Sequence, residues 1–449
     1  MAAALLLGSA VPAGGSSGVP WKENKPIITV RKEVYRKHPR PKAAAMVAVW
    51  YVGPKLERRE VHALEIRDDV PDEPKWRFSA DNGRTWSGLT PMPPTLSYPK
   101  KVEVWEGGCP KLYDDQTGVL VETWLRQIQH KGDHFNHTYV RLSRDHGKTW
   151  STPRMLRYEN GDEFDPDNPI KPSFLKRNLA YFGNNIIRHS NGTLVLAVAA
   201  ANIPKDAPDP NPRRISGYGI TPDSRGIGSL CFVGKWNGQR ERYNWRAGKC
   251  VWVPRHVSSR GLMEPEVAEL KDGRVLVIWR GSNQNLDAAK QPGRKWFSVS
   301  TDGGMTLSPV AELKYDDGSR FYSPSSIHRM IRHSVTGKLY WVGNISPRPT
   351  KGNSPRYPLL IAEMDEKIPA LKRSTVSVID DRKPDQPGGV QFSNFSLLEN
   401  RETHDLELYL TAYGEDASSV YTADCYKHTV KLILPRVRLD APSSGCGTE

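Results

Sequence analysis

The segment Ser79-Ala-Asp-Asn-Gly-Arg-Thr-Trp86 decides the fold, because the chain contains it more than once. Residues 143–150 read Ser-Arg-Asp-His-Gly-Lys-Thr-Trp, which is the same pattern, S-x-D-x-G-x-T-W. Residues 300–307 repeat it with leucine in place of the final tryptophan. The aspartate and glycine favour a tight turn in which the carboxylate accepts hydrogen bonds from backbone N–H groups. We expect three equivalent turns, in which the last side chain packs between neighbouring sheets.

A longer unit recurs six times along the chain: a turn, often with glycine, then an apolar strand and a small or polar exit. Its first strand residues fall near positions 43, 118, 192, 273, 337 and 406, so the unit recurs about every 73 residues. These segments are rich in β-branched and aromatic residues, which is typical of strands. In five units another predicted strand lies just upstream, so the unit opens with a hairpin. The segment upstream of the first copy, residues 33–40, is a poorer strand.

Six units of about four strands each predict an all-β protein, a six-bladed β-propeller whose blades close into a ring. The alternative, an open stack of hairpins, would leave two long exposed sheet edges. We expect a leader over residues 1–24, a single propeller over 25–440 and a flexible tail over 441–449. No stretch approaches the ~18–20 uninterrupted apolar residues of a transmembrane helix. We therefore expect no membrane span.

Charge and cysteine usage restrict the class of partner and the compartment. The 64 Lys and Arg residues exceed the 50 Asp and Glu residues by 14, which predicts an anionic partner. The basic residues are scattered and no nucleic-acid-binding motif occurs, so we expect an anionic glycan or oligosaccharide and no nucleic acid. Five cysteines without a CxxC pair argue against structural zinc. The apolar start of the chain is similar to a signal peptide that lacks its basic region, which favours a secreted or periplasmic protein.

The octapeptide resembles the Asp box of the sialidase-like, BNR-repeat family, and at the level of the fold the resemblance covers nearly the whole chain. It implies a propeller with structural Asp-box turns on the outer turns of the blades. It also implies three arginines that bind a substrate carboxylate, a tyrosine nucleophile paired with a glutamate, and an aspartate as acid/base. A planar guanidinium binds a carboxylate through two hydrogen bonds. A neutral tyrosine nucleophile avoids repulsion with an anionic sugar.

The best local match to the family's site is the stretch MEPEVAELKDGRVLVIWR, which ends at Arg280. It resembles an inner-strand glutamate followed, one hairpin later, by an arginine. The two-residue period of a strand places Glu264 and Glu266 on one face, with Arg280 at the same mouth. Either glutamate could be the partner of the tyrosine. Arg356 resembles the family's third arginine.

Other positions depart from the family's pattern. Where the family has Tyr-Ser near the last blade, this chain has Phe392 followed by serine, and phenylalanine cannot act as a nucleophile. Tyr322, one blade earlier, is the nearest inner-strand tyrosine that could replace it. Arg36 is a weak candidate for the first arginine. His38, expected on an inner strand, is a further substrate-binding candidate, and the acid/base is unassigned.

Histidines are the other candidates for proton transfer. Besides His38, His134 and His137 are expected in an exposed loop between strands. A histidine or tyrosine base beside an arginine that neutralises a uronate is the logic of polysaccharide lyases, some of which also resemble propellers.

Two further features are open. The acidic loop 160–168 offers the carboxylates of Asp162, Asp165 and Asp167, which could hold calcium. The loop lacks a known calcium pattern, however, and we expect no metal and no organic cofactor.

Cys231 and Cys250 are either buried free thiols or one disulfide. The tryptophans that could stack on sugar rings are Trp105, Trp124 and Trp279.

The sequence therefore predicts a sialidase-like glycoside hydrolase of the exo-alpha-sialidase type that acts on an acidic carbohydrate. The alternatives are a polysaccharide lyase acting on a uronic acid polymer and a non-catalytic propeller that binds carbohydrate or protein. In the first reading, Arg280, Arg356 and Arg36 clamp the carboxylate, Glu264 or Glu266 is the base or charge stabiliser, and a tyrosine is the nucleophile.

Overall fold

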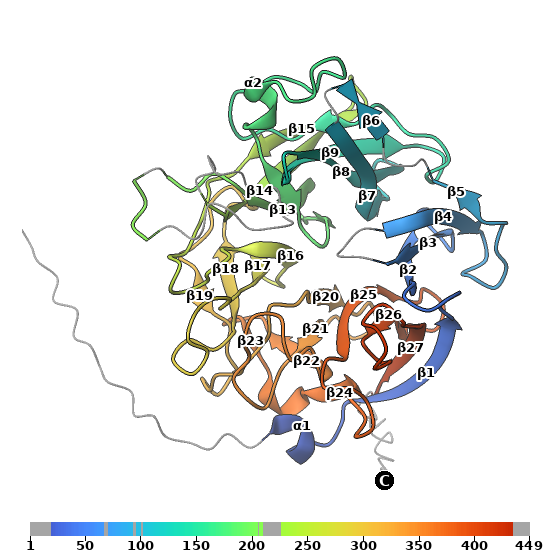
Figure 1. The fold of residues 1–449 in the computed structure, drawn as a ribbon, viewed down its shortest axis with the longest axis vertical. Helices are drawn as coiled ribbons and strands as arrows, with labels where there is room; N and C mark the ends of the chain where they lie inside the picture. Colours follow the sequence, from blue (N-terminus) through green and yellow to red (C-terminus); the bar gives the residue numbers. More distant parts are fainter. Residues whose placement is uncertain are drawn as a thin grey trace, which may run out of the picture.

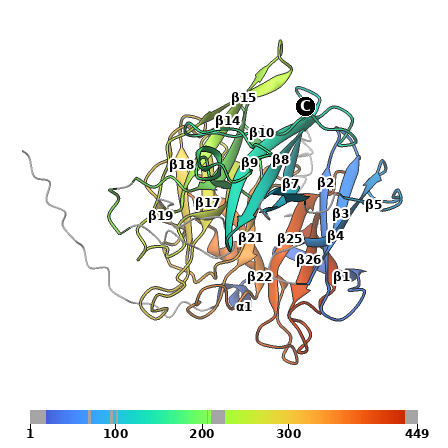
Figure 2. The same cartoon turned by 45° about the horizontal axis from the view of Figure 1, so that its top comes forward.

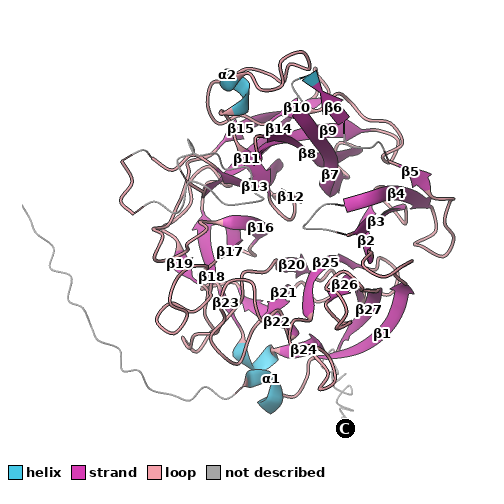
Figure 3. Ribbon diagram, in the orientation of Figure 1, coloured by secondary structure: helices cyan, strands magenta, loops and turns pink. Residues whose placement is uncertain are grey.

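The structure, a computed structural model, describes residues 19–66, 71–92, 96–99, 102–204, 206–209 and 226–433. These residues form six small sheets arranged in a ring (Figures 1 and 3), so the protein is a six-bladed β-propeller, as the six repeats predict. Residues 1–18 and 434–449, which hold most of the expected leader and all of the expected tail, lie outside the described residues. Those two boundaries stay predictions.

The first three blades follow one another along the chain, each from its inner strand outward. Blade 1 contains β2 (Ala44–Tyr51), β3 (Arg58–Glu65), β4 (Pro71–Ser79) and β5 (Thr90–Pro91). Blade 2 contains β7 (Val102–Asp114), β8 (Val119–His130), β9 (Asp133–Ser143) and β10 (Arg154–Met155), with β6 (Leu96–Tyr98) beside β7. Blade 3 contains β11 (Ala180–Phe182), β12 (Ile187–Arg188), β13 (Thr193–Ala200), β14 (Gly228–Asn237) and β15 (Arg242–Ala247).

The last three blades complete the ring. Blade 4 contains β16 (Met263–Glu269), β17 (Val275–Arg280), β18 (Lys295–Ser300) and β19 (Ala311–Glu312). Blade 5 contains β20 (Arg329–Arg332), β21 (Leu339–Asn344), β22 (Leu359–Asp365), β23 (Ala370–Leu371) and β24 (Ser377–Asp380). Blade 6 contains β25 (Gln391–Glu399), β26 (Leu406–Tyr413), β27 (Cys425–Leu432) and β1 (Ile28–Arg36).

The ring is closed by a strand from the start of the chain. Strand β1 pairs antiparallel with β27, from Ile28 opposite Leu432 to Arg36 opposite Cys425, and forms the outer edge of blade 6 (Figure 1). The expectation that residues 33–40 open the first repeat was therefore wrong. The first copy, near residue 43, is also one strand out of phase, because it forms the inner strand β2 whereas the other five copies form second strands. An apolar strand looks alike at either position, and only the pairing with β27 distinguishes them.

The three octapeptide turns share one set of hydrogen bonds. In each turn the aspartate Oδ1 accepts a 2.8 Å bond from the backbone N–H of the threonine, at Asp81, Asp145 and Asp302. The serine Oγ accepts a 2.8 Å bond from the glycine N–H in all three. That glycine has a positive φ of 85, 87 or 101°, which favours glycine over any residue with a side chain. The expected carboxylate-to-backbone bonds are thus present, at the ends of β4, β9 and β18.

The apolar core lies between neighbouring blades. One buried cluster joins Leu276 and Ile278 of blade 4 to Trp341 and Leu360 of blade 5, and similar clusters occupy other blade interfaces. Two short helices, α1 (Pro20–Glu23) and α2 (Pro172–Leu175), and the 3₁₀ turn Arg373–Thr375 lie outside the sheets. Within the described residues no helix is long and apolar enough to cross a membrane.

Candidate active site

The candidate site lies where the inner strand of blade 4 begins and its second strand ends. Met263, at the start of β16, is paired with Arg280 at the end of β17. The register then shifts between Met263 and Glu266, and Glu264 adopts a positive φ of 44°. A β-bulge of this kind redirects a side chain out of the regular alternation, and a strained non-glycine residue is common at functional sites.

The guanidinium of Arg280 is bound on three sides. Its Nη1 donates to a carboxylate oxygen of Glu264 at 2.5 Å. Its Nε donates to the Ser325 hydroxyl at 2.8 Å, and its Nη2 donates to Asn353 Oδ1 at 3.3 Å. Arg280 is 5% exposed, so these contacts fix its orientation at the mouth.

Arg356 reaches the same place from the loop between β21 and β22. Its Nη2 donates to the backbone carbonyl of Ser325 at 3.1 Å, and its Nη1 donates to Gln391 Oε1 at 2.8 Å. Ser325 therefore connects the two arginines, one through its hydroxyl and the other through its carbonyl. The structure brings Arg280, Arg356 and Glu264 together, as the sequence predicts.

Electrostatics confirm that several cations surround Glu264. Burial by itself would raise the pKa of the Glu264 carboxyl, but the charges of Arg280, Arg260 and Arg356 lower it below the ordinary value. The carboxylate is thus ionised at neutral pH. Arg260, which is 7% exposed, was missed in the sequence because it lies in a loop before β16 that carries no recognisable pattern.

A lysine and a histidine lie beneath the arginines. Lys295 of β18 is paired with Arg280 and is fully buried, and its ammonium donates to the carbonyls of Ser326 and Pro324. Burial, together with the charge of Arg280, holds the pKa of Lys295 well below its usual range. Burial also holds the pKa of His328 well below its usual range. The charge of Arg280 acts on both groups in the same direction as burial.

Glu266 does not share this site. The bulge turns it toward blade 5, where its Oε1 accepts the backbone N–H of Met330 at 3.1 Å and its Oε2 lies 3.4 Å from Arg329 Nη1. Burial raises the pKa of Glu266 to about 7, although Arg329 opposes the shift. The expectation that Glu264 and Glu266 lie on one face was wrong, because the two-residue period fails at a bulge.

Tyr322 and Phe392, the two aromatic residues considered for the nucleophile's position, have other surroundings. Tyr322 packs under the guanidinium of Arg294, 4.7 Å from the ring centroid, and its backbone pairs with Ser346. Phe392 is fully buried in the core of blades 5 and 6, so it neither occupies nor blocks the mouth. Its neighbour Gln391, whose amide accepts a bond from Arg356, is the residue of β25 that reaches the site. The alternation along β25 contained this information, since Phe392 fits the apolar side.

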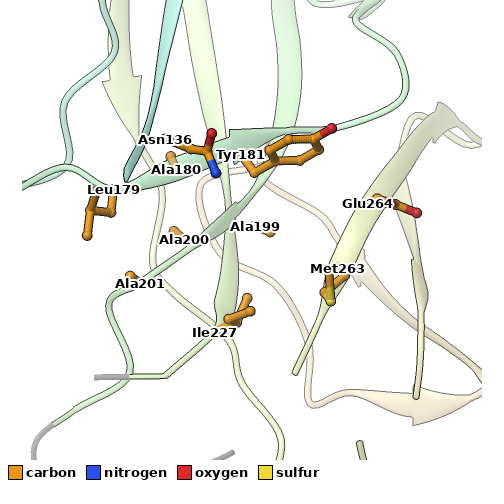
Figure 4. A pocket seen from close by; sticks show the side chains of 10 residues that line it. All are labelled: Asn136, Leu179, Ala180, Tyr181, Ala199, Ala200, Ala201, Ile227, Met263 and Glu264. Carbon is orange, nitrogen blue, oxygen red and sulfur yellow. The ribbon is translucent and has the colours of Figure 1, made fainter. Parts of the chain in front are cut away.

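A pocket opens beside Glu264, on the side of blade 3 (Figure 4). Its cavity volume is about 20 Å³, which is enough for a single water molecule. Its polar side chains are Glu264, Tyr181 of β11 and Asn136 of β9, and its apolar wall includes three consecutive alanines, 199–201. Tyr181 is thus the tyrosine that lines one pocket with Glu264. A single aromatic residue in a short strand gives no signal that sequence patterns could detect.

The two candidates near the start of the chain lie elsewhere. Arg36 donates to the backbone carbonyls of Met46 and Ala63, at 3.3 and 3.0 Å, from the outer strand β1. His38 follows that outer strand and binds Asp424 through its ring at 2.7 Å, so the inner-strand expectation was wrong. Both side chains tie blade 6 to blade 1 and neighbouring loops. No described contact joins either of them to Arg280.

The remaining histidine candidates lie in a strand, and a carboxylate of the acidic loop forms an ion pair with a lysine. His134 and His137 are in strand β9 rather than in a loop. His137 is fully buried and stacks on Phe174 with 4.2 Å between ring centroids, and burial lowers its pKa to about 3. In the acidic loop, Asp162 pairs with Lys171 at 2.6 Å. Among the described residues no group of three or more His, Cys, Asp or Glu side chains is arranged to hold a metal ion.

The cysteine and tryptophan alternatives are also decided. Cys231 is a buried free thiol, so it forms no disulfide with Cys250. Trp279 is fully buried, and Trp124 is 9% exposed with the Arg141 guanidinium 3.7 Å from its ring centroid. Of the three tryptophans named as sugar platforms, Trp105 alone is half-buried rather than enclosed.

Comparison with known proteins supports the fold. No protein-family model matches the chain, and no curated protein matches it. Among solved structures, a protein of unknown function from Dyadobacter fermentans is 14% identical, with 90% of this chain and 99% of that chain covered and a TM-score of 0.57. The NanB sialidase from Streptococcus pneumoniae is 11% identical, with 89% and 70% covered and a TM-score of 0.53. An α-L-arabinofuranosidase from Fusarium graminearum is 11% identical, with 90% and 97% covered and a TM-score of 0.50. The chain therefore has the propeller fold that sialidases also have.

Proposed function

We propose that the protein is a sialidase-like glycoside hydrolase that acts on an acidic carbohydrate. The observation that carries the proposal is the pair of arginines joined through Ser325, with a buried, ionised Glu264 against Arg280. Guanidinium groups at a partly closed mouth bind a carboxylate strongly. The net charge of +14 adds a long-range attraction for anionic ligands.

In this function each group has a distinct task. Arg280 and Arg356 bind the sugar carboxylate and fix the ring over Glu264. We assign the nucleophile to Tyr181 in place of Tyr322, because it lines one pocket with Glu264 (Figure 4). Its oxygen attacks the anomeric carbon and gives its proton to Glu264, while the glycosidic C–O bond breaks and the leaving alcohol takes a proton from water. A neutral hydroxyl avoids repulsion with the anionic sugar. Glu264 stabilises the positive charge that develops on the ring.

The direct test is release of free sialic acid from a simple aryl sialoside. We expect the native protein to release sialic acid and Arg280→Ala to release it at least 100-fold more slowly. The control is Arg320→Ala, which removes an exposed arginine that forms an ion pair with Glu312. This variant should retain full activity. Absence of release at high protein concentration, or equal activity of the two variants, would contradict the proposal.

A non-catalytic carbohydrate-binding propeller is the second candidate. It is favoured by Phe392, which stands where the family resemblance implies a tyrosine and is fully buried, while its neighbour Gln391, at the start of β25, reaches Arg356 with an amide. Calorimetry with the same sialoside distinguishes the two: binding that needs Arg280, with no product after prolonged incubation, would identify the binding protein. A product absorbing in the far ultraviolet from a uronate polymer would instead identify the lyase.

A further inference from the structure

Blade 2 has the longest strands of the propeller. Strands β7, β8 and β9 contain 13, 12 and 11 residues, whereas the inner hairpin of blade 4 is made of strands of 7 and 6 residues. Figure 2 shows β8 and β9 as long neighbouring strands. The part of these strands around Asn136 of β9 lies near Glu264, because Asn136 and Glu264 line the same pocket.

Three side chains form one row across this part of blade 2. Trp105 of β7 is directly opposite Gln127 of β8, and Gln127 is directly opposite Asn136 of β9. Residues that lie directly opposite one another share a face of the sheet. We call Trp105, Gln127 and Asn136 the polar row. The next row outward, Glu103, Gln129 and His134, is also hydrophilic.

The indole of Trp105 lies over Gly107 of the same strand. A Cβ placed on Gly107 would come within 2.6 Å of the indole ring, so the ring covers the position where a side chain would stand. The residue as a whole is half-buried, so part of the indole is accessible to a ligand. Glycine at 107 leaves the room that this placement needs.

At the other end of the row, Asn136 directs an amide N–H group without a partner toward the pocket. Asn136 is 1% exposed, and its Oδ1 accepts a 2.9 Å bond from Gln127 Nε2. Its Nδ2 is buried and has no hydrogen-bond partner. An unpaired buried N–H group is destabilising, and Figure 4 shows this side chain at the pocket beside Tyr181. An acceptor from a ligand would satisfy it.

We propose that the polar row binds uncharged sugar units of a glycan, next to the acidic unit held at Arg280 and Arg356. A sugar ring has an apolar C–H face, which matches the flat indole, and a rim of hydroxyls, which match the amides. Two strand spacings separate Trp105 from Asn136 by about 10 Å, the span of a disaccharide. The substrate is then an acidic glycan chain rather than a free acidic monosaccharide. That an acidic unit is held at Arg280 and Arg356 rests on the proposed function, whereas the binding of uncharged units at the polar row does not.

The test uses neutral disaccharides, which need no acidic group. We would record saturation-transfer difference NMR with lactose, cellobiose and arabinobiose on the full chain and on four variants. We expect saturation of at least one disaccharide by the native protein and by Arg280→Ala. Trp105→Ala should weaken the affinity about five- to tenfold, the size expected for one lost aromatic contact, and Gln127→Ala should weaken it less. Trp236→Ala, a half-buried tryptophan on β14, is the matched control and should bind normally.

Three results would overturn the proposal: no saturation of any disaccharide, undiminished binding by Trp105→Ala when Gln127→Ala is also unchanged, or loss of neutral-sugar binding in Arg280→Ala. Failure of the proposed function has a different signature, because sialoside would then be neither cleaved nor bound while the neutral disaccharides still contact the polar row.

Discussion

Two buried arginine–glutamate pairs in this propeller are made of the same groups but have different surroundings. Arg58 and Glu407 lie 2.9 Å apart between blades 1 and 6, with side chains 2% and 5% exposed. Arg280 and Glu264 lie 2.5 Å apart within blade 4, with side chains 5% and 9% exposed. The first pair we call the closure pair, and the second the mouth pair.

The neighbours of the two pairs explain the difference. Around the closure pair, Glu407 also accepts bonds from Lys427 and Asn400, and Arg58 donates to the hydroxyl of Tyr51. Around the mouth pair, two further arginines affect Glu264, and a pocket adjoins it. The closure pair stabilises the contact between two blades, whereas additional cations beside a pocket favour an anionic ligand. Burial and geometry alone would not have separated these roles.

The largest loss of stability is expected when the closure pair is broken. Arg58→Ala leaves the buried Glu407 with reduced compensation and should lower the free energy of unfolding by about 4 kcal/mol. Urea unfolding followed by tryptophan fluorescence measures the change, with the exposed Arg320→Ala as control. A loss no greater than that of the control would mean that the closure pair does not stabilise the ring.

The second largest effect is the pH dependence of stability caused by Glu266, which has one arginine, Arg329, beside it instead of several. Its pKa of about 7 in the folded protein is above the ordinary 4.5. The folded state therefore keeps a proton that the unfolded chain loses, and stability falls as pH rises from 4.5 to 7. The fall should amount to about 3 kcal/mol. Unfolding measured at pH 5 and pH 8 should show this fall in the native protein and not in Glu266→Gln; parallel curves would place the Glu266 pKa near its ordinary value.

The third effect is that of breaking the mouth pair, which should reduce the affinity for a sialoside more than it reduces the free energy of unfolding. Arg280→Ala should weaken affinity for a sialoside about 100-fold, or ~2.7 kcal/mol. Its loss of unfolding free energy should be smaller than that of Arg58→Ala, because Arg260 and Arg356 still compensate Glu264. Calorimetry measures the affinity of Arg280→Ala for the sialoside, and urea unfolding of Arg280→Ala and Arg58→Ala measures the two losses of stability. Equal destabilisation by the two substitutions would remove the distinction between the pairs.

The smallest effect on stability is expected in the octapeptide turns, whose aspartates are half-buried or exposed. Hydrogen bonds from Thr149 and Ser143 lower the pKa of Asp145 to about 2. A lowered pKa contributes stability that is present above the unfolded value and is lost as pH falls through the folded value. The difference in stability between native protein and Asp145→Asn should therefore be constant from pH 7 to pH 4 and should vanish toward pH 2. A difference that persists at pH 2 would show that the carboxylate charge is not what the turn uses.

The sequence predicted the part of the site that lies within one hairpin or follows a repeat. Glu264 and Arg280 are 16 residues apart on adjacent strands, so the hairpin and the family resemblance placed both at one mouth, although the sequence left the choice between Glu264 and Glu266 open. Arg36, His38 and Tyr322 were assigned to the site from position along the chain, and their real contacts lie elsewhere. Arg260, Gln391, Ser325 and Tyr181 were missed because each comes from a different loop or blade.

Taken alone, the sequence determined the all-β class, the six-fold repeat, the octapeptide turns and an arginine-rich mouth. These depend on local turn chemistry and on the two-residue period of strands, which act over a few residues. The tertiary structure alone decided that β1 closes the last blade, that a bulge separates Glu264 from Glu266, and that Phe392 faces the core. Each of these depends on pairing or packing between segments brought together only when the ring closes, and chain order does not encode such contacts in any short pattern.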